Sequence, residues 1–547
     1  MLLGVQTFAQ TPSWQWARNG TGTNTDKGYS IAVDGFGNSY ITGYFSSTNI
    51  MFGSTTLINA NSAGTSDDIF IAKYDPSGNL LWAKQQGGNA DDIANSIAVD
   101  AAGDSFIAGY FESTSITFGT TTLTNAGLHD LFFVKYDPAG NVLWAKSAGG
   151  IKSDYATSVS VDGIGNCYLA GNFQSTSIVF GTTTLTNADA TNSTSDIFLA
   201  KYDPSGNVLW VQNYGGAYED VPKSISVDAA GNCYMAGWFL TSTTIGTTTM
   251  ASNALDDWFV AKFNSSGNVL WSTSAGGGNR DQAYGVAFDG AGNCYASGYF
   301  VSPTMVIGST TLSNTNSLDL LVVKYDPSGN PLWAKHAGGD RPAIAYSVSV
   351  DAAGDCFVTG NFADSAITIG TTTLLNHDPT GFTGDMFLLK MDPQGNVLWA
   401  KNEDADVGTS VKVDGSGNGY VTGFFNGLSV SFGADSFINA NNSGKLGEVF
   451  IARIGKDIDG IVTNENFNNG ISVFPNPSAG IFQLETKNGN VGTPQIEIYD
   501  ALGNVVLKTE MLNEQTTINL SQAAKGIYFY RVFDEEKMIS TGKLAIE

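Results

Sequence analysis

The sequence has few charged residues and no long apolar run, and both shortages narrow the class of protein. Only 14% of its 547 residues are charged, and 26 Lys plus Arg face 51 Asp plus Glu, which gives a net charge of −25. Such a charge repels phosphate backbones and anionic lipids, so we expect no nucleic-acid partner. No stretch approaches the roughly 18 apolar residues of a membrane-spanning helix, so we expect no transmembrane segment.

Cysteine and histidine are also scarce. Four cysteines occupy one position in successive repeats such as GNCYLAG, namely Cys167, Cys233, Cys294 and Cys356. Equivalent positions of neighbouring repeats normally lie farther apart than the roughly 4.4–6.8 Å Cα separation of a disulfide, so we expect buried free thiols. No cysteine pair has metal-ligand spacing and only three histidines occur, so we expect no metal site built on these residues.

A repeated unit is what the sequence has in abundance. Seven tryptophans lie 66, 62, 66, 61, 62 and 66 residues apart, each at the end of a segment such as YDPSGNVLW: Trp16, Trp82, Trp144, Trp210, Trp271, Trp333 and Trp399. Repeats of this length stack on one another and share a core. The 65 glycines are typical of short strands joined by tight turns, so we expect an all-β fold with structural tryptophans.

Each unit is expected to hold four principal strands and a small hairpin. After Trp82 the strand patterns are SIAVD (96–100), SFIAGYF (105–111), DLFFVKYD (130–137) and VLWAK (142–146), with the hairpin at ITFGTTTLTN (116–125). In turns such as DPSGN, proline presets φ, Asp accepts hydrogen bonds from the backbone and glycine supplies a positive φ. We therefore assign these Asp and Asn residues to turns and expect no cofactor, with calcium binding left open.

The number of strand patterns predicts a closed ring. SIAVD-type strands and DxFhAK-type strands each occur seven times, but EVFIARIGKD lacks a following LW strand. The N-terminal SWQWARNG is an LW-type strand without a preceding partner. Ser13 to Arg18 should therefore complete the last sheet, which predicts a seven-bladed β-propeller over residues 10–456.

The motifs DxFhAKYDPSGNhLWAK and SIxVDxxGNxYhxG resemble the SBBP-type β-propeller repeat of bacterial secreted proteins. That resemblance implies the fold and no particular activity. YDPSGNVLW is also similar to the tryptophan-docking repeat of pyrroloquinoline-quinone dehydrogenases. Those enzymes use eight blades, a bound calcium and often a vicinal disulfide, whereas this chain has seven repeats and no adjacent cysteines.

The repeat pattern ends at Lys456, and residues 457–470 are polar and predicted to be a linker. Segments such as ISVFPNPSAGIFQLE and INLSQAAKGIYFYRV resemble, in order and spacing, the C-terminal sorting domain of type IX secretion cargo, over residues 471–547. The short strands predict a small Ig-like antiparallel sandwich. The residues that carry the sorting motif are Pro475, Asn476, Pro477, Gly480, Gly526, Lys543 and Leu544.

The sorting resemblance implies contact with the type IX secretion machinery and an extracellular or outer-membrane-surface location. It further implies either attachment to surface lipopolysaccharide or release, and it allows for removal of the domain. The first residues, MLLGVQTFAQ, resemble the end of a secretory signal peptide, so we expect residues 1–9 to be its remnant.

Residues that break the repeat are the better functional candidates, because packing explains the repeated ones. Loops between blades and the small hairpins should share one face, where variable loops on a rigid ring suit binding. The candidate ligand-binding residues in these loops are Tyr218, Glu219, Arg280, His336, Asp340 and Arg341. Six repeated aspartates form a further ring that either holds a cation or, as we expect, accepts backbone N–H groups: Asp26, Asp92, Asp154, Asp220, Asp281 and Asp406.

Two functions remain open at the level of sequence. No GxSxG, HExxH or glycine-rich phosphate motif occurs, which favours an exported non-enzymatic protein that binds glycans or proteins through the loop-rich face. The alternative is a secreted polysaccharide lyase or glycoside hydrolase with its site at the mouth of the channel, because paired carboxylates are invisible in a sequence with 51 acids.

Overall fold

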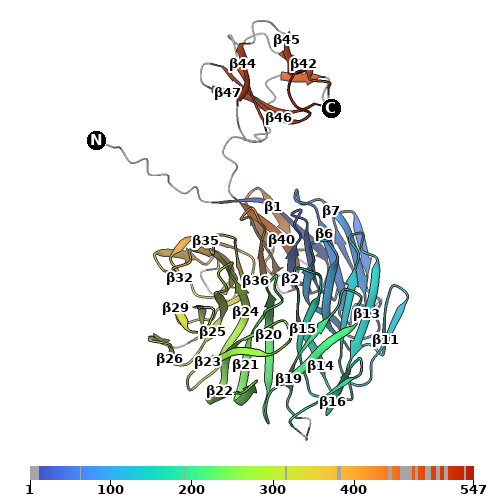
Figure 1. Cartoon of the computed structure of the whole chain (residues 1–547), viewed down its shortest axis with the longest axis vertical. Coiled ribbons are helices and arrows are strands. Elements are labelled where there is room, and N and C mark those ends of the chain that lie inside the picture. Colours follow the sequence, from blue (N-terminus) through green and yellow to red (C-terminus); the bar gives the residue numbers. More distant parts are fainter. Residues whose placement is uncertain are drawn as a thin grey trace. The chain divides into compact units, whose positions relative to one another are not determined.

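All regular elements in the described part of the chain are β-strands (Figure 1). The computed structural model describes residues 12–61, 63–189, 191, 193–314, 317–378, 384–440, 446–455, 471–474, 478–486, 495–500, 505–510, 515–534 and 537–546. Within these residues, no helix is long and apolar enough to cross a membrane. The chain divides into two compact units, residues 1–456 and 457–547. The expected signal remnant (1–9) and linker (457–470) lie outside the described residues.

The first unit consists of seven four-stranded antiparallel blades, as the strand patterns predict (Figure 1). The first three blades, from inner to outer strand, are β2 (Asp26–Val33), β3 (Ser39–Phe45), β6 (Asp68–Tyr74), β7 (Leu80–Gln86); β8 (Asp92–Val99), β9 (Ser105–Phe111), β12 (Asp130–Tyr136), β13 (Val142–Ala148); and β14 (Asp154–Val161), β15 (Cys167–Phe173), β18 (Asp196–Tyr202), β19 (Val208–Tyr214). The next three are β20 (Asp220–Val227), β21 (Cys233–Ile245), β22 (Thr248–Phe263), β23 (Val269–Ala275); β24 (Asp281–Phe288), β25 (Cys294–Phe300), β28 (Asp319–Tyr325), β29 (Pro331–Ala337); and β30 (Ala343–Val350), β31 (Cys356–Phe362), β34 (Asp385–Met391), β35 (Val397–Glu403). The seventh is β36 (Val407–Val413), β37 (Gly419–Phe425), β40 (Glu448–Gly455) and β1 (Ser13–Gly22).

A small hairpin joins the second and third strands of six blades, which confirms the predicted hairpins. These are β4 (Asn49–Phe52) with β5 (Thr55–Ile58), β10 (Ser115–Phe118) with β11 (Thr121–Thr124), β16 (Ser177–Phe180) with β17 (Thr183–Thr186), β26 (Thr304–Ile307) with β27 (Thr310–Ser313), β32 (Ala366–Ile369) with β33 (Thr372–Leu375), and β38 (Ser429–Phe432) with β39 (Asp435–Ile438). In the fourth blade the hairpin is continuous with β21 and β22, and the bulge in β21 has Thr241 at a φ of 64°.

The N-terminal strand closes the ring. β1 pairs antiparallel with β40, with Ser13 opposite Gly455 and Asn19 opposite Phe450. Its final residues pair with β4 of the first blade, where Gly20 lies opposite Phe52. The prediction that residues from Ser13 onward complete the last blade is confirmed, and the same strand also ties the last blade to the first.

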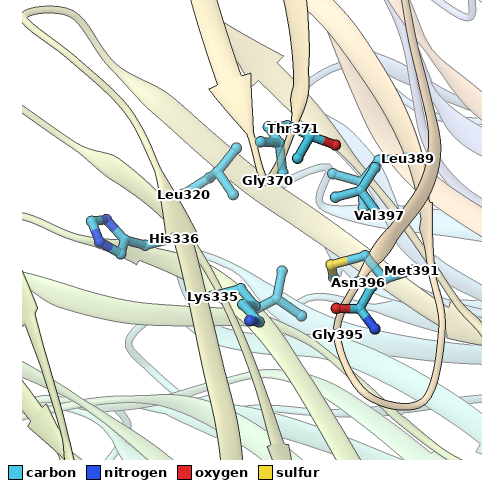
Figure 2. Close-up of a pocket in the computed structure, with 12 residues that line it drawn as sticks. Leu320, Lys335, His336, Gly370, Thr371, Leu389, Met391, Gly395, Asn396 and Val397 are labelled. Carbon is cyan, nitrogen blue, oxygen red and sulfur yellow. The ribbon is translucent and has the colours of Figure 1, made fainter.

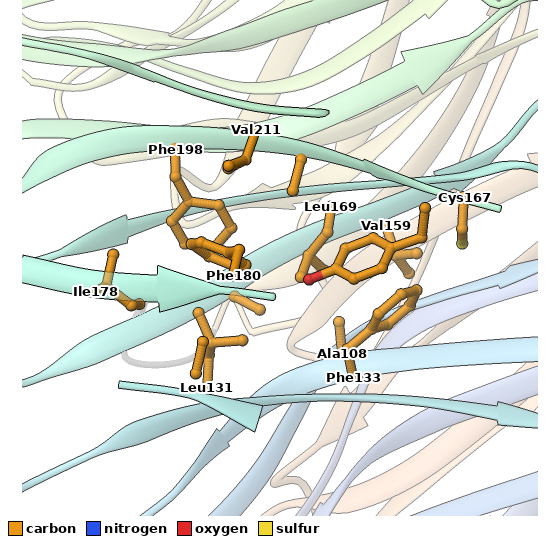
Figure 3. Packing of buried hydrophobic residues seen from close by; sticks show 14 of the residues in the cluster. Ala108, Leu131, Phe133, Val159, Cys167, Leu169, Ile178, Phe180, Phe198 and Val211 are labelled. Carbon is orange, nitrogen blue, oxygen red and sulfur yellow. The ribbon is translucent and has the colours of Figure 1, made fainter. Parts of the chain in front are cut away.

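The apolar core lies between neighbouring blades. Between the second and third blades, Phe133 of β12 packs with Leu169 of β15 and Phe198 of β18, all fully buried (Figure 3). Period-2 alternation along each strand supplies one such face per blade, and stacking the blades removes both faces from water. Cys167 belongs to this cluster, and all four cysteines are buried free thiols, as expected.

Six of the seven repeated tryptophans dock on the outer turn of the next blade. The Trp210 indole donates a hydrogen bond from Nε1 to the Ser265 carbonyl over 3.2 Å. A Cβ at Gly267, whose φ is +80°, would lie 3.1 Å from the Trp210 ring. The equivalent bonds run from Trp16 to Pro76, Trp82 to Pro138, Trp144 to Pro204, Trp271 to Pro327 and Trp333 to Pro393. The turn glycine is therefore required by the neighbouring blade as well as by its own backbone.

The turn aspartates have the role that the sequence predicts. Asp203 accepts backbone N–H bonds from Ser205 and Asn207 on Oδ1, and the Asn207 amide donates to its Oδ2 over 2.8 Å. The same pattern recurs at Asp75 and Asp326. These hydrogen bonds hold the pKa of the Asp203 carboxyl below its usual range.

The second unit is a two-sheet antiparallel sandwich, as predicted. Its strands are β41 (Ile471–Phe474), β42 (Ile481–Thr486) and β45 (Gln515–Asn519) in one sheet, and β44 (Val505–Glu510), β43 (Gln495–Tyr499), β46 (Gly526–Asp534) and β47 (Lys537–Ile546) in the other. Both sheets contribute to one core, in which Phe482 and Leu544 are fully buried.

The sorting-motif residues fall in different parts of this sandwich. Gly480 has a φ of +95° and its carbonyl accepts a hydrogen bond from the Leu520 amide over 2.6 Å. Gly526 begins β46, while Lys543 and Leu544 lie in β47. Pro475, Asn476 and Pro477 lie outside the described residues.

Candidate binding site in the propeller channel

A cavity of about 200 Å³ lies on the axis of the propeller, and all seven inner strands line it. One equivalent position in each inner strand contributes a half-buried side chain, and the residue type changes from blade to blade. We call these residues the channel ring: Tyr29, Asn95, Thr157, Lys223, Tyr284, Tyr346 and Thr409.

A β-bulge in every inner strand creates the channel ring. In the first blade Gly28 lies opposite Gly43 and Ser30 lies opposite Thr42, so Tyr29 between them has no partner across the sheet. The register skips at the equivalent residue in all six other blades. Because a bulged residue is released from the ladder, its side chain can be re-aimed, here into the channel.

The residue after each bulge is structural. The Ser158 hydroxyl accepts a hydrogen bond from the Ile225 amide of the next inner strand over 3.0 Å. Equivalent bonds link Ser30 to Ile97, Ser96 to Val159, Ser224 to Val286, Ser347 to Val411 and Ser410 to Ile31. Gly285 takes the place of serine in the fifth blade. A constant serine therefore links neighbouring blades, while the residue before it is free to vary.

One side of the channel ring is occupied by bonds to the protein backbone. The Asn95 amide donates to the Ala156 carbonyl over 2.9 Å, and the Thr409 hydroxyl donates to the Gly28 carbonyl over 2.7 Å. The Thr157 hydroxyl donates to the Ala170 carbonyl. In each of these three side chains a donor is therefore already engaged by the backbone.

The other side of the ring presents its functional groups to the cavity. The Tyr284 and Tyr346 rings meet edge to face with centroids 5.4 Å apart, and the Lys223 Nζ lies 5.5 Å from the Tyr284 centroid. Among the described residues, neither the Lys223 ammonium nor the Tyr346 hydroxyl has a hydrogen-bond partner. We call Lys223, Tyr284 and Tyr346 the aromatic sector.

Lys412 is a second cation in the same cavity. It lies three residues beyond Thr409, at a position where the other blades have only Ala or Ser: Ala32, Ala98, Ser160, Ser226, Ala287 and Ser349. Burial among the inner strands lowers the pKa of Lys412 and of Lys223, and the charge of Glu219 partly opposes this for Lys223. Both amines thus line the cavity, and neither forms an ion pair among the described residues.

A polar network joins the predicted residue Arg280 to the aromatic sector. The Arg280 Nε lies 3.7 Å from the Asp256 carboxylate, which also accepts a hydrogen bond from the Gln282 amide over 2.5 Å. The Tyr284 hydroxyl in turn donates to Gln282 Oε1 over 3.2 Å. The Arg280 side chain is 64% exposed, so its guanidinium remains open to a ligand above the channel.

The remaining predicted ligand residues are divided between the loops and an outer strand. Glu219 fixes its own loop, because its carboxylate accepts both the amide and the hydroxyl of Ser195, over 3.1 and 2.7 Å. Tyr218 is 43% exposed beside it. Asp340 and Arg341 are exposed in the loop after β29, where the Arg341 amide donates to Asp364.

The loop position predicted for His336 is wrong. His336 lies in the outer strand β29, with its Nδ1 3.0 Å from Asp319 Oδ2. It borders a separate cavity of about 190 Å³ between the fifth and sixth blades, where Leu320 faces Met391 and Val397 (Figure 2). The alternation of LWAKHA continues the strand through His336, which is why this residue belongs to a blade and not to a loop.

The repeated aspartates accept backbone N–H bonds, as expected. Asp26 accepts the Ser47 amide over 3.2 Å and the Ser47 hydroxyl over 2.7 Å. Backbone amides likewise donate to Asp92, Asp154, Asp220, Asp281 and Asp406. Five of the six are the first residue of their inner strand and do not lie in the preceding loop. Burial raises the pKa of Asp26 and of Asp220 to about 8.

The paired glycines of the inter-blade loops make room for a second set of buried aspartates, which lie in the third strands of the blades. A Cβ at Gly149 would lie 2.0 Å from Asp130 Oδ1, and one at Gly150 would lie 2.6 Å from the Ser175 hydroxyl. The GG motif is thus a packing requirement of buried acids. In the part of the chain that the structure describes, no group of three or more His, Cys, Asp or Glu is placed to hold a metal ion.

Sequence reasoning missed the channel ring and Lys412. A sequence signal was present, since a single variable position stands before a nearly constant serine in every SIAVD-type strand. Regular alternation cannot reveal that this position is bulged, because the bulge depends on the register with the second strand.

A seven-bladed β-propeller with a cavity on its axis, followed by a small β-sandwich, is the class of protein that these features define. Residues 15–50 match the family model of a β-propeller repeat, and residues 472–547 match that of the secretion system C-terminal sorting domain. The chain therefore contains an SBBP-type β-propeller repeat and a type IX secretion sorting domain, and the sorting domain marks it for export to the cell surface or the extracellular space.

Two curated proteins are similar to this chain at low identity. The uncharacterized WD repeat-containing protein L264 of Acanthamoeba polyphaga mimivirus is 24% identical over 512 residues, which covers 76% of this chain and 36% of that protein. The regulatory protein FlaEY of Caulobacter vibrioides is 24% identical over 437 residues, which covers 73% of this chain and 43% of that protein. The chain therefore matches less than half the length of these curated relatives.

Two solved structures are also similar to this chain. The WD40 β-propeller domain of Doa1 is 9% identical with a TM-score of 0.42, and the match covers 82% of this chain and 98% of that one. PorZ, an essential surface component of the type IX secretion system of Porphyromonas gingivalis, is 12% identical with a TM-score of 0.21 over 95% of this chain and 81% of that one.

Proposed function

We propose that the exported propeller binds glycans without converting them, with a terminal sugar unit in the axial cavity. The observation that carries this proposal is the channel ring, which presents a different side chain from every blade. A ligand without sevenfold symmetry needs such a position, because identical residues would offer it seven equal sites.

The chemistry of the aromatic sector suits a sugar. Tyrosine rings pack against the apolar faces of pyranose rings, while hydroxyl, amide and ammonium groups hydrogen-bond to sugar hydroxyls. A volume of about 200 Å³ is smaller than the roughly 300–1,000 Å³ of sites for drug-sized ligands, so it fits one sugar unit and not a chain. The rest of a glycan would lie over the loop face near Tyr218, Arg280 and Arg341.

The lining of the cavity supports binding over hydrolysis. Glycoside hydrolysis commonly uses two carboxyl groups on either side of the scissile bond. As far as the structure describes it, the lining contains no Asp or Glu side chain. A lyase remains the competing function, since elimination can proceed with a tyrosine or lysine base.

A glycan array with the full-length protein, run beside a turnover screen on the retained glycans, tests the proposal. We expect retention on a subset of glycans without accumulation of new reducing ends or unsaturated products. Tyr284→Ala and Tyr346→Ala should each weaken binding about tenfold through loss of ring contacts. Ser205→Ala, in an outer turn of the opposite face, is the matched control and should bind like the parent.

Three results would contradict the proposal. Product formation would establish an enzyme, and absence of glycan binding in the parent protein would remove the proposed ligand class. A double variant with Arg280→Ala and Arg341→Ala should weaken binding of long glycans while Ser77→Ala with Ser205→Ala does not. If the serine double variant weakened binding and the arginine double variant did not, the binding face would lie on the opposite side of the propeller.

A further inference from the structure

Two lysines stand out against the charge pattern of the molecule. Four lysines at one repeated position in the third strands face carboxylates; for example, Lys135 lies 2.8 Å from Asp104, and Lys390 lies 2.9 Å from Asp351. In a protein with a net charge of −25, Lys223 and Lys412 are the two cations that line the axial cavity. Within the described residues neither takes part in an ion pair or hydrogen bond.

The fold does not require either lysine. The channel ring holds Asn or Thr in place of Lys223 in three other blades, and the Lys412 position holds Ala or Ser in all six. Placing an ammonium group in a narrow cavity without a carboxylate costs free energy through lost hydration. Burial lowers the pKa of both amines, and this cost falls mainly on the half-buried Lys223, because the Lys412 side chain is exposed to the channel. An anionic group between them would offset that cost.

The two lysines come from different levels of the channel. Lys223 projects from the bulge of β20 beside Tyr284, and Lys412 projects from β36 three residues further along its strand than the bulge residue Thr409. The cavity therefore combines an aromatic wall with two cations that come from different positions along the inner strands. A ring-shaped ligand that carries a carboxylate matches this order of groups.

We propose that the axial cavity selects an acidic sugar unit, a hexuronate, with its carboxylate directed to Lys412 and Lys223 and its ring against Tyr284 and Tyr346. This inference rests on the proposed glycan-binding function and narrows its ligand class. The sugar hydroxyls supply hydrogen-bond acceptors and donors for the Tyr346 hydroxyl, and a carboxylate supplies the strong, charge-assisted partner that a lysine ammonium prefers.

Titration calorimetry of the full-length protein with glucuronate, galacturonate, glucose, galactose and acetate tests the inference. We expect the two uronates to bind at least tenfold more tightly than the neutral sugars, as for the gain of a charge-assisted hydrogen bond. Acetate should bind more weakly than either uronate, because it cannot contact the aromatic sector. Acetate binding equal to that of the uronates would overturn the sugar assignment.

Substitutions of Lys412 and Lys223 test how the charge of each lysine affects ligand affinity, separately from any effect on folding. Lys412→Met and Lys223→Met should each lower uronate affinity tenfold or more and lower neutral-sugar affinity by a clearly smaller factor, while Lys412→Arg retains uronate binding. Lys146→Met, on the outer strand β13, is the matched control and should change neither affinity. A thermal melt of each variant confirms folding.

Failure of this inference is distinguishable from failure of the proposed function. Equal binding of neutral and acidic sugars, or uronate binding unaffected by both Lys→Met changes, overturns the acidic-sugar assignment and leaves glycan binding intact. Absence of any sugar or glycan binding overturns both.

Discussion

At the scale of single residues, the blades are held together by contacts that repeat with the chain. Six outer-strand tryptophans donate to a turn carbonyl of the next blade and pack over the turn glycine, as Trp210 does at Ser265 and Gly267. The indole contributes apolar contact and one hydrogen bond, and the glycine contributes the absence of a Cβ. Neither residue can change without affecting the other, which makes the pair a unit.

A double-mutant cycle on Trp210 and Gly267 tests this coupling. Trp210→Ala should lower the free energy of unfolding by about 2–4 kcal/mol, somewhat below the cost of a fully buried tryptophan because the ring is half exposed. Gly267→Ala should cost about 1–3 kcal/mol, since alanine is strained at a φ of +80° and its methyl group meets the indole. In the Trp210→Ala background, the cost of Gly267→Ala should fall to the part that comes from backbone strain, because the indole is no longer there to meet the methyl group.

The control for the cycle is Gly290→Ala, because nothing lies within 4 Å of a Cβ there. It should change stability by less than about 0.5 kcal/mol. Strict additivity of Trp210→Ala and Gly267→Ala in urea unfolding would show that the two residues act independently.

At the scale of elements, the sequence predicts the strands better than the site. Four strands per repeat, seven repeats and the closing role of Ser13 to Arg18 all follow from motif spacing, because turn chemistry and period-2 alternation are local. The bulges at Tyr29 and Lys223 are set by register between two strands, so no single strand reveals them. The repeat motif ends at LWAK, so the sequence predicts a loop at His336. In the structure, strand β29 extends past this motif and includes His336.

Deletion of residues 10–20 tests the role of β1. The seventh blade would lose its outer strand, the edge of β40 would be exposed, and Trp16 would no longer pack with Tyr74 and Tyr420. We expect the Tm to fall by roughly 10 °C, as several kcal/mol are lost from a large domain. Removing residues 1–9 is the control and should leave the Tm unchanged. A deletion variant that melts within about two degrees of the parent would be incompatible with closure by this strand.

At the scale of the whole molecule, buried acids give the propeller a characteristic pH response. Burial raises the pKa of Asp26 and Asp220 from 3.8 to about 8, so the folded state binds protons that the unfolded state releases. Their contribution to stability is fully present below about pH 4 and is lost as the pH rises through 8. The turn aspartates, such as Asp203, have lowered pKa values, so their contribution is fully present above about pH 4 and is lost only as the pH falls below that value.

We therefore expect the Tm to be higher at pH 5 than at pH 8. Asp26→Asn with Asp220→Asn should flatten this dependence, because the amide keeps the shape of the carboxyl and does not titrate. Asp203→Asn is the matched control and should leave the slope between pH 5 and pH 8 unchanged. Differential scanning calorimetry in buffers of constant ionic strength measures the effect, and a parent protein that gains stability from pH 5 to pH 8 would refute it.

The closing strand also has a consequence for assembly. The Ala17 amide meets the Asp435 carboxylate 418 residues further along the chain, so the strand that is synthesised first finds its place last. Contacts of such sequence separation form slowly, and until then the edge of β40 is an open template for pairing. At high concentration the N-terminal strand of a second molecule can take that place with the same register. Ring closure is thus the step at which domain swapping competes with folding, and dilute refolding favours the monomer.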